Sequence, residues 1–422
     1  MTLLSSTISG IDAVAARLDL LDRPISVAGV IRSVRQRSGL DDFGDDPFMG
    51  ALERLCSACE SEARLSLLGH WMTRWDIARF LGNLLLLREQ ELRDSAILEE
   101  EIEKPLFITG LPRTGTTFLH KLLLEDAANE SPRAYQTIHP YPIEGEAGVD
   151  ASRRIAAVNR RLRMFDRLAP EFRGLHPMDA TSPQECSEIT GHVFASLRFD
   201  TTYYIPSYRE WLDANGHIAA FRFHKRFLQH LQHRTGRRRW VLKCPDHVFA
   251  LDAIRTVYPD ARIVFVHRDP MRVLASVVRL TEILREPFTC AIDRIALGRQ
   301  QSERWHHGTR LIQRAAERQE FAEPICHIRH TELIAAPALV IEQMYAHFGL
   351  TLDELTSQRI EAVTAEMPNG GYGVHRYRLK DYGLDEDEEC QRFESYMEAF
   401  GIVPELGDSR YEEKRKSLPR AV

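Results

Sequence analysis

The sequence lacks any long hydrophobic run. Although 44% of its 422 residues are hydrophobic, no apolar stretch approaches the roughly eighteen residues that a membrane-spanning helix needs. The first residues also lack a basic region ahead of their apolar patch, so we expect no signal peptide. The length is sufficient for a large core, and the composition is that of a globular protein.

Cysteine is scarce and the charge is nearly balanced. The seven cysteines are odd in number and scattered, which predicts reduced thiols and a cytoplasmic location. Cys56 and Cys59 form a C-x-x-C pair, but no second pair lies at zinc spacing, so we expect no metal site. The net charge of −6 gives no sign of a nucleic-acid partner.

The first hundred residues show the periodicity of helices. Apolar positions recur at helical spacing over residues 11–21, 51–68 and 75–92. This predicts an all-helical N-terminal region, residues 1–100, ahead of an α/β domain, residues 101–422. The helical region carries no catalytic motif, so we expect it to pack against the α/β core.

The chain is organised around residues 105–124. An apolar run at 106–108 predicts a buried parallel strand, residues 110–115 form a glycine-containing turn, and a helix with an apolar face follows. Strand, turn and helix N-terminus form a phosphate cradle, because backbone N–H groups and the helix dipole converge on one point.

This cradle lacks the lysine of ATP-binding P-loops. Gly110 and Gly115 have the P-loop spacing, but Thr116 stands at the lysine position and Arg113 lies within the loop. The missing lysine argues against triphosphate chemistry. The forked guanidinium of Arg113 can grip a phosphate or sulfate group at two points.

Two further cations follow apolar strands. Lys243 comes directly after the strand predicted at 240–242, where ligands bind in open parallel sheets. Arg268 follows the strand at 263–266, beside a helix start formed by Asp269 and Pro270, and Ser276 lies eight residues further on. Two anion sites at two strand ends suit a ligand with separated 5′ and 3′ phosphates.

Several of these stretches resemble one known family. Pro-Arg-Thr-Gly-Thr-Thr at 112–117 resembles the 5′-phosphosulfate loop of sulfotransferases that use 3′-phosphoadenosine 5′-phosphosulfate (PAPS). The R-D-P-x5-S spacing from Arg268 to Ser276 resembles their 3′-phosphate motif, and residues 330–350 resemble a later stretch of the same enzymes. The resemblance covers roughly residues 100–400 and is to bacterial-type sulfotransferases related to the tyrosylprotein sulfotransferases.

The resemblance implies a P-loop-like, mainly parallel sheet with helices on both faces. It implies transfer of a sulfuryl group from PAPS, without a metal, to a hydroxyl or amine of a small-molecule acceptor. Arg113 and Lys243 would neutralise the leaving phosphate, and Arg268 and Ser276 would hold the 3′-phosphate. The 5′-phosphosulfate would be held by the loop and the helix start: Arg113, Thr114, Gly115, Thr116, Thr117 and Phe118.

The general base is where the sequence departs from this family. Related enzymes carry a carboxylate after the loop helix, in a β-capable stretch matching residues 133–140, but the matched position here is Gln136, which cannot accept a proton. We therefore assign the base to His247, close after Lys243. Four residues remain as alternatives: His139, Asp246, Glu185 and Glu188. The two glutamates are expected on one helix face, with Ser182 as its cap.

Two other functions stay open at this point. A P-loop kinase or NTPase would require ATP and Mg²⁺, and a non-catalytic homologue would bind the nucleotide without turnover. The basic, aromatic segment at 370–379 is interpreted either as a lid over the nucleotide or as an ordinary surface loop.

Overall fold

A computed structural model describes residues 24–142, 151–175, 177–236, 238–367 and 378–405. Five strands form one sheet in the order β2-β3-β1-β4-β5, and every pairing is parallel. The expected parallel sheet is therefore confirmed. The strands are β1 Leu106–Gly110, β2 Asn129–Glu130, β3 Arg239–Lys243, β4 Arg262–His267 and β5 Cys326–Arg329.

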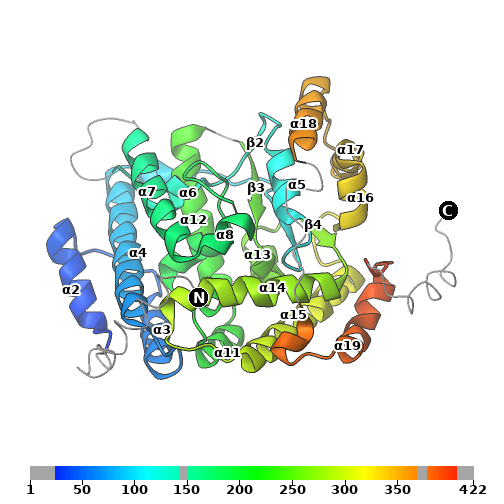
Figure 1. Ribbon diagram of the computed structural model, residues 1–422. Coiled ribbons are helices and arrows are strands. Elements are labelled where there is room, and N and C mark those ends of the chain that lie inside the picture. Colours follow the sequence, from blue (N-terminus) through cyan, green and yellow to red (C-terminus); the bar gives the residue numbers. More distant parts are fainter. Residues whose placement is uncertain (1–23, 143–150, 176, 237, 368–377, 406–422) are drawn as a thin grey trace.

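Successive side chains of the strands pack into two apolar layers, one on each face of the sheet. Leu106 and Ile108 of β1 point to one layer, and Phe107 points to the other. Helices α5 (Thr116–Leu123) and α17 (Pro337–His347) cover the first face. The second face packs against α12 (Ile218–Thr235) and α13 (Leu251–Val257). Helices thus lie on both sides of the sheet, as Figure 1 shows.

The N-terminal region is helical. It contains α2 (Val27–Ser38), α3 (Met49–Ser61) and α4 (Leu67–Arg93), which lie together at the left of Figure 1. The boundary between α3 and α4 differs from the prediction, because the Ser66 hydroxyl accepts from the Gly69 N–H (3.0 Å) and starts α4 earlier than residue 75.

The helical region and the sheet share apolar packing. Leu81 and Leu84 of α4 belong to the same buried cluster as Phe107 of β1 and Phe265 of β4. This continuity matches the expected role of the N-terminal helices, which is to pack against the α/β core. The boundary at residue 100 stays a prediction.

Two local predictions are wrong, and side-chain hydrogen bonds explain both. Residues within the β-capable stretch form helix α6 (Ala134–Ile138), because the Gln136 amide oxygen accepts from the Arg133 N–H (2.8 Å). Ser182 does not cap a helix, since its hydroxyl accepts from the Asp179 N–H (2.9 Å) in a turn. Helix α9 (Cys186–Thr190) begins later, and Glu185 precedes it.

The remaining helices surround the sheet. Those that matter below are α7 (Ser152–Leu168), α8 (Pro170–Leu175), α14 (Pro270–Arg285), α15 (Arg294–Arg318) and α19 (Glu386–Ala399). In the part of the chain that the structure describes, no helix is both long and apolar enough to cross a bilayer. The helix predicted at 11–21 and most of the segment at 370–379 lie outside the described residues.

Candidate active site

The loop after β1 is shaped by two glycines. Gly110 has φ 137°, and a Cβ built there would lie 2.4 Å from the Val266 carbonyl oxygen of neighbouring β4. Gly115 has φ 93° and precedes α5, whose N-terminus no side chain caps. The backbone N–H groups at this helix start are thus available to an anionic ligand.

Arg113 lies at the turn of this loop. It adopts φ 66°, a left-handed conformation that is uncommon outside glycine. Its Nε donates to the Ser276 hydroxyl (3.2 Å) on α14, and its carbonyl oxygen accepts from Arg268 Nη1 (2.9 Å). The loop and the segment after β4 therefore form one continuous site, although more than 150 residues separate them.

Lys243 is the last residue of β3 and is buried. Its Nζ lies 2.5 Å from a carboxylate oxygen of Glu185. The turn before α9 is held beside α6 by an antiparallel bridge between Arg133 and Pro183, which places Glu185 above the end of β3. The ammonium group is thus kept at the carboxyl edge of the sheet, where Arg113 and Arg268 also lie.

Arg268 holds a carboxylate in the structure. Two of its guanidinium nitrogens contact both oxygens of Glu405 at 2.7–3.1 Å. The Glu405 N–H donates to Asp269 (2.9 Å). Burial alone would raise the pKa of Glu405, but the hydrogen bonds and charges of His330 and Arg268 outweigh burial and lower this pKa to about 2. The carboxylate is therefore ionised at neutral pH, as a bound phosphate would be.

These groups line one cleft of about 540 Å³. Its lining includes the expected catalytic residue Lys243 and all but one of the nucleotide-binding residues expected from the sequence: Arg113, Gly115, Thr116, Thr117, Phe118, Arg268 and Ser276. Thr114 is buried, and its hydroxyl donates to the Leu111 carbonyl (2.8 Å). The same cleft is also lined by apolar side chains, which we call its apolar wall: Phe172, Val277, Leu280, Leu284, Trp305 and Ile334.

His247 is not among the residues that line this cleft. It is 2% exposed, and its ring packs against Phe107 (5.1 Å between centroids) and Phe221 (6.0 Å) in the core. Burial lowers the pKa of His247 well below its usual value. If His247 were an ordinary histidine base, kcat/KM would rise with pH through a group titrating near 6–7. The lowered pKa means that His247 does not produce such a rise.

The alternative bases separate into two groups. Glu185 and Asp246 line the cleft. Glu188 instead pairs with Arg79 (2.7 Å) and Arg198 (3.3 Å). His139 contacts Arg161 (2.7 Å), and burial together with the charge of Arg161 lowers the pKa of His139 to about 3. The expectation that Glu185 and Glu188 share a helix face is wrong, because Glu185 precedes α9.

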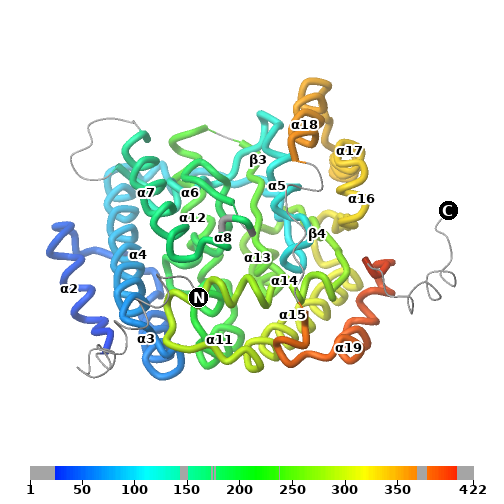
Figure 2. Tube along the Cα trace, in the orientation of Figure 1, coloured from blue at the N-terminus to red at the C-terminus, as the bar shows by residue number. Residues whose placement is uncertain are grey.

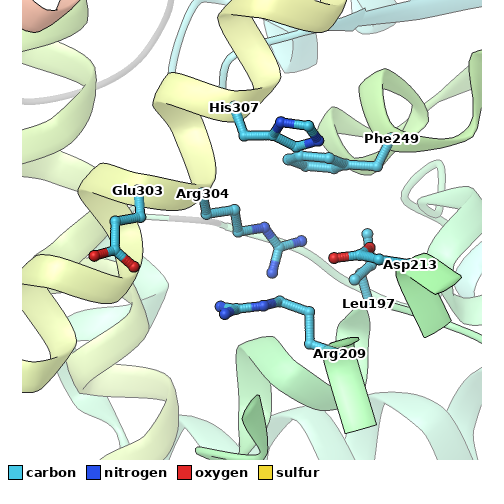
Figure 3. A pocket seen from close by; sticks show the side chains of 7 residues that line it. All are labelled: Leu197, Arg209, Asp213, Phe249, Glu303, Arg304 and His307. Carbon is cyan, nitrogen blue, oxygen red and sulfur yellow. The ribbon is translucent and has the colours of Figure 1, made fainter. Parts of the chain in front are cut away.

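A second, smaller cavity of about 160 Å³ lies behind the cleft, and Arg304 lines both. Figure 3 shows the Arg304 side chain between Arg209 and Phe249, near the Asp213 carboxylate. Arg304 donates to Asp246 (2.6 Å) and to the fully buried Asp200 (3.1 Å). Arg304 thereby fixes the Asp246 carboxylate against the cleft wall.

Sequence reasoning missed Glu405 and Arg304, which belong to no recognised motif. It also expected no metal, and in the described ranges no three His, Cys, Asp or Glu side chains are grouped to hold an ion. Cys56 and Cys59 are both buried on α3, and burial raises the pKa of Cys56 to about 12.

Comparison with known proteins points to one family. The family model described as sulfotransferase family matches residues 105–354. Proteins from Mycobacterium bovis and Mycobacterium tuberculosis, both called omega-hydroxy-beta-dihydromenaquinone-9 sulfotransferase Stf3, are 25% identical over 297 residues, covering 66% of this chain and 70% of each relative.

Two solved structures are similar over most of the chain. Sulfotransferase STF1 from Mycobacterium tuberculosis has a TM-score of 0.76 and 29% identity, covering 88% of this chain and 99% of its own. Sulfotransferase STF9 from Mycobacterium avium has a TM-score of 0.77 and 26% identity, covering 90% and 98%. With a phosphate-type loop and three cations at the carboxyl edge of its sheet, the chain belongs to the sulfotransferase family, which implies sulfotransferase activity with PAPS as donor.

Proposed function

We propose that the protein transfers the sulfuryl group of PAPS to a hydroxyl group of an apolar, lipid-like acceptor. The observation that carries this proposal is the mixed lining of one cleft, which contains both the cations Arg113, Lys243 and Arg268 and the apolar wall. The names of the Stf3 relatives refer to a hydroxylated menaquinone derivative, which is an alcohol on a lipid-like body. Such an acceptor matches the apolar wall.

The polar groups that line the cleft suit PAPS. The uncapped start of α5 and the Arg113 guanidinium suit the 5′-phosphosulfate, together with the loop from Thr114 to Phe118. Arg268 and Ser276 suit the 3′-phosphate, since Arg268 already binds the two oxygens of a carboxylate. In this assignment Thr114 contributes its backbone N–H, because its hydroxyl bonds to Leu111.

The transfer step moves the sulfuryl group from the phosphate of PAPS to the oxygen of the acceptor. PAPS supplies a sulfur atom bonded to a phosphate leaving group. The acceptor oxygen forms a bond to sulfur, the bond between sulfur and the bridging oxygen breaks, and the electron pair stays on the phosphate. Lys243 and Arg113 stabilise this charge, which is typically worth about 3–4 kcal/mol for each donor. Because both cations are side chains, the scheme uses no metal ion.

We assign the general base to Glu185 in place of His247. Its carboxylate lines the cleft beside Lys243, and the Gln184 N–H donates to the Pro132 carbonyl (2.7 Å) next to α6. Glu185 therefore reaches the cleft from a segment adjoining α6, the helix on which relatives would carry a carboxylate. The acceptor proton passes to Glu185 as the new bond forms.

A turnover screen tests the proposed function. The protein is incubated with PAPS and alcohols of increasing chain length, and formation of the sulfate ester is followed by mass spectrometry. We expect kcat/KM to rise with chain length, because longer chains bury more area against the apolar wall. Preference for a sugar or a short polar alcohol would contradict the assignment of a lipid-like acceptor, and ATP turnover with Mg²⁺ would contradict the donor.

Arg268→Ala is expected to weaken binding of the product 3′-phosphoadenosine 5′-phosphate by about 2–3 kcal/mol, the worth of a charge-assisted contact in a partly dry site. Binding of adenosine 5′-phosphosulfate, which lacks the 3′-phosphate, should weaken less, because only the support that Arg268 gives to the Arg113 carbonyl is then lost. Calorimetry measures both affinities. Arg329→Ala, at the end of β5 and paired with Glu332, serves as the control. Equal losses for the two ligands would remove the 3′-phosphate assignment.

Glu405→Gln is expected to tighten binding of the same product by about three- to tenfold, because the ionised carboxylate competes for Arg268 and keeps the site fractionally occupied. A ligand without a 3′-phosphate should gain nothing. Glu332→Gln, an exposed carboxylate that pairs with an arginine, is the matched control. Weaker binding by Glu405→Gln would show that Glu405 assists the nucleotide rather than opposing it.

A further inference from the structure

Helix α7 presents an arginine face that the proposed chemistry does not use. The helix contains six arginines and one acidic residue, in a chain whose net charge is −6. Two of the arginines point inward: Arg154 donates to the carbonyls of His139 (3.0 Å) and Pro140 (3.2 Å), and Arg161 lies over the Trp75 ring (4.7 Å). These contacts anchor α7 and fix which side faces outward.

The opposite side is exposed and of one sign. We call it the outer face of α7, and it consists of Arg153, Arg160, Arg163, Met164 and Arg167. Arg160, Arg163 and Arg167 are spaced by three and four residues, so they share one side of the helix. Within the described residues, none of these three lies within 4.0 Å of a carboxylate.

Large apolar side chains are exposed at the same end of the molecule. Met164 is 48% exposed and Trp71 of α4 is 53% exposed. The two helices meet there, because Phe165 stacks on Phe288 (6.2 Å) and the Phe288 carbonyl accepts from the Ser66 N–H (3.0 Å) at the start of α4. Figure 1 shows α7 and α4 side by side. Arginine beside exposed tryptophan and methionine is typical of helices that lie on a membrane surface.

This surface adjoins the apolar wall of the cleft. One residue, Ala169, separates α7 from α8, and the chain turns directly from one to the other in Figure 2. Phe172 of α8 lines the cleft and packs edge-to-face on Phe165 of α7 (5.2 Å). A ligand embedded in a surface against α7 would therefore lie close to the wall proposed for the acceptor.

We propose that the outer face of α7, together with Trp71, binds the surface of an anionic lipid bilayer. Each arginine near an anionic leaflet raises partitioning about fivefold, so three contribute about a hundredfold. Nucleic acid would also attract arginines, but exposed Met164 and Trp71 favour a lipid surface. The proposal rests on the proposed function only for its purpose, which is access to a membrane-held acceptor.

Vesicle flotation of the full chain, without PAPS, tests the surface. We expect binding to vesicles of phosphatidylcholine with phosphatidylglycerol, no binding to phosphatidylcholine alone, and loss of binding at high salt. The triple variant R160E/R163E/R167E should lose a hundredfold or more in partitioning, because each substitution removes an attraction and adds a repulsion. Trp71→Ser should weaken binding severalfold without changing its salt dependence.

A matched control carries the same change in charge elsewhere. R299E/R310E/R314E alters three exposed arginines of α15 and should bind vesicles like the wild type. Equal losses in both triple variants would reduce the effect to net charge and overturn the proposal, as would unchanged binding by R160E/R163E/R167E. Preferential binding of the wild type to a DNA duplex would also overturn it. Thermal unfolding checks that both variants remain folded.

Turnover measurements distinguish a failure of the membrane surface from a failure of the proposed function. With a short, water-soluble alcohol, R160E/R163E/R167E should keep the wild-type kcat, whereas turnover of a vesicle-embedded alcohol should fall with binding. If no alcohol is sulfated but vesicle binding follows the expected pattern, the acceptor assignment fails and the membrane surface stands. If soluble alcohols are sulfated and no vesicle binds, the membrane surface fails alone.

Discussion

Lys243→Ala should lower kcat by about a hundredfold or more while the affinity for PAPS changes little. The lysine ends β3 within the cleft, with its ammonium 2.5 Å from Glu185 and on the same edge as Arg113. Its charge is needed when the leaving phosphate forms, so its loss affects the transition state more than the bound donor. Single-turnover kinetics with PAPS measure this rate.

Two controls keep the Lys243 result interpretable. Thermal unfolding and product affinity show whether the variant is folded and binds nucleotide, because the partner Glu185 stays partly exposed and can be hydrated. Arg113→Ala should show a comparable loss of kcat, since it acts on the same leaving group. A Lys243→Ala protein with nearly normal kcat would reduce this lysine to a structural partner of Glu185.

Glu185→Gln should also lower kcat at least a hundredfold, with PAPS affinity kept, because an amide cannot take the acceptor proton. The substitution preserves size and hydrogen bonding to Lys243. Glu188→Gln is the matched control: it lies three residues away, pairs with Arg79 and Arg198, and does not line the cleft. We expect its kcat to stay near the wild-type value.

The same assay decides among the other bases. Asp246→Asn and His247→Asn are compared with Glu185→Gln, because Asp246 lines the cleft and His247 was the base assigned from the sequence. We expect His247→Asn to alter stability more than rate, since His247 is buried among aromatic rings. If His247→Asn or Asp246→Asn loses kcat and Glu185→Gln keeps it, the proposed base is wrong.

The sequence predicted those parts of the site that are encoded locally. The loop at 110–115, Lys243 at the end of β3, and Arg268 with the cap at Asp269 each depend on a few consecutive residues, and all are found at the expected strand ends. The ion pairs were not predictable, because they join distant segments: 58 residues separate Lys243 from Glu185, and 137 separate Arg268 from Glu405. No local pattern encodes such pairings.

The errors in secondary structure have a related cause. Residues 133–140 suit a strand, but the Gln136 side chain accepts from the Arg133 N–H and starts a helix there. Ser182 suits a helix cap, but its hydroxyl closes a turn with Asp179. Both side chains have more than one possible backbone partner, and tertiary contacts such as the bridge from Arg133 to Pro183 select between them. Local propensity therefore fixed where these segments turn but not which residue starts the helix.

The left-handed conformation of Arg113 makes the two halves of the nucleotide site interdependent. Its side chain contacts Ser276 and its carbonyl contacts Arg268, so the group that grips one end of the ligand also supports the residues at the other. Free energies of binding at the two ends should therefore not add. A double-mutant cycle between Arg113→Ala and Arg268→Ala should give a coupling of about 0.5–3 kcal/mol, the range for residues in one network.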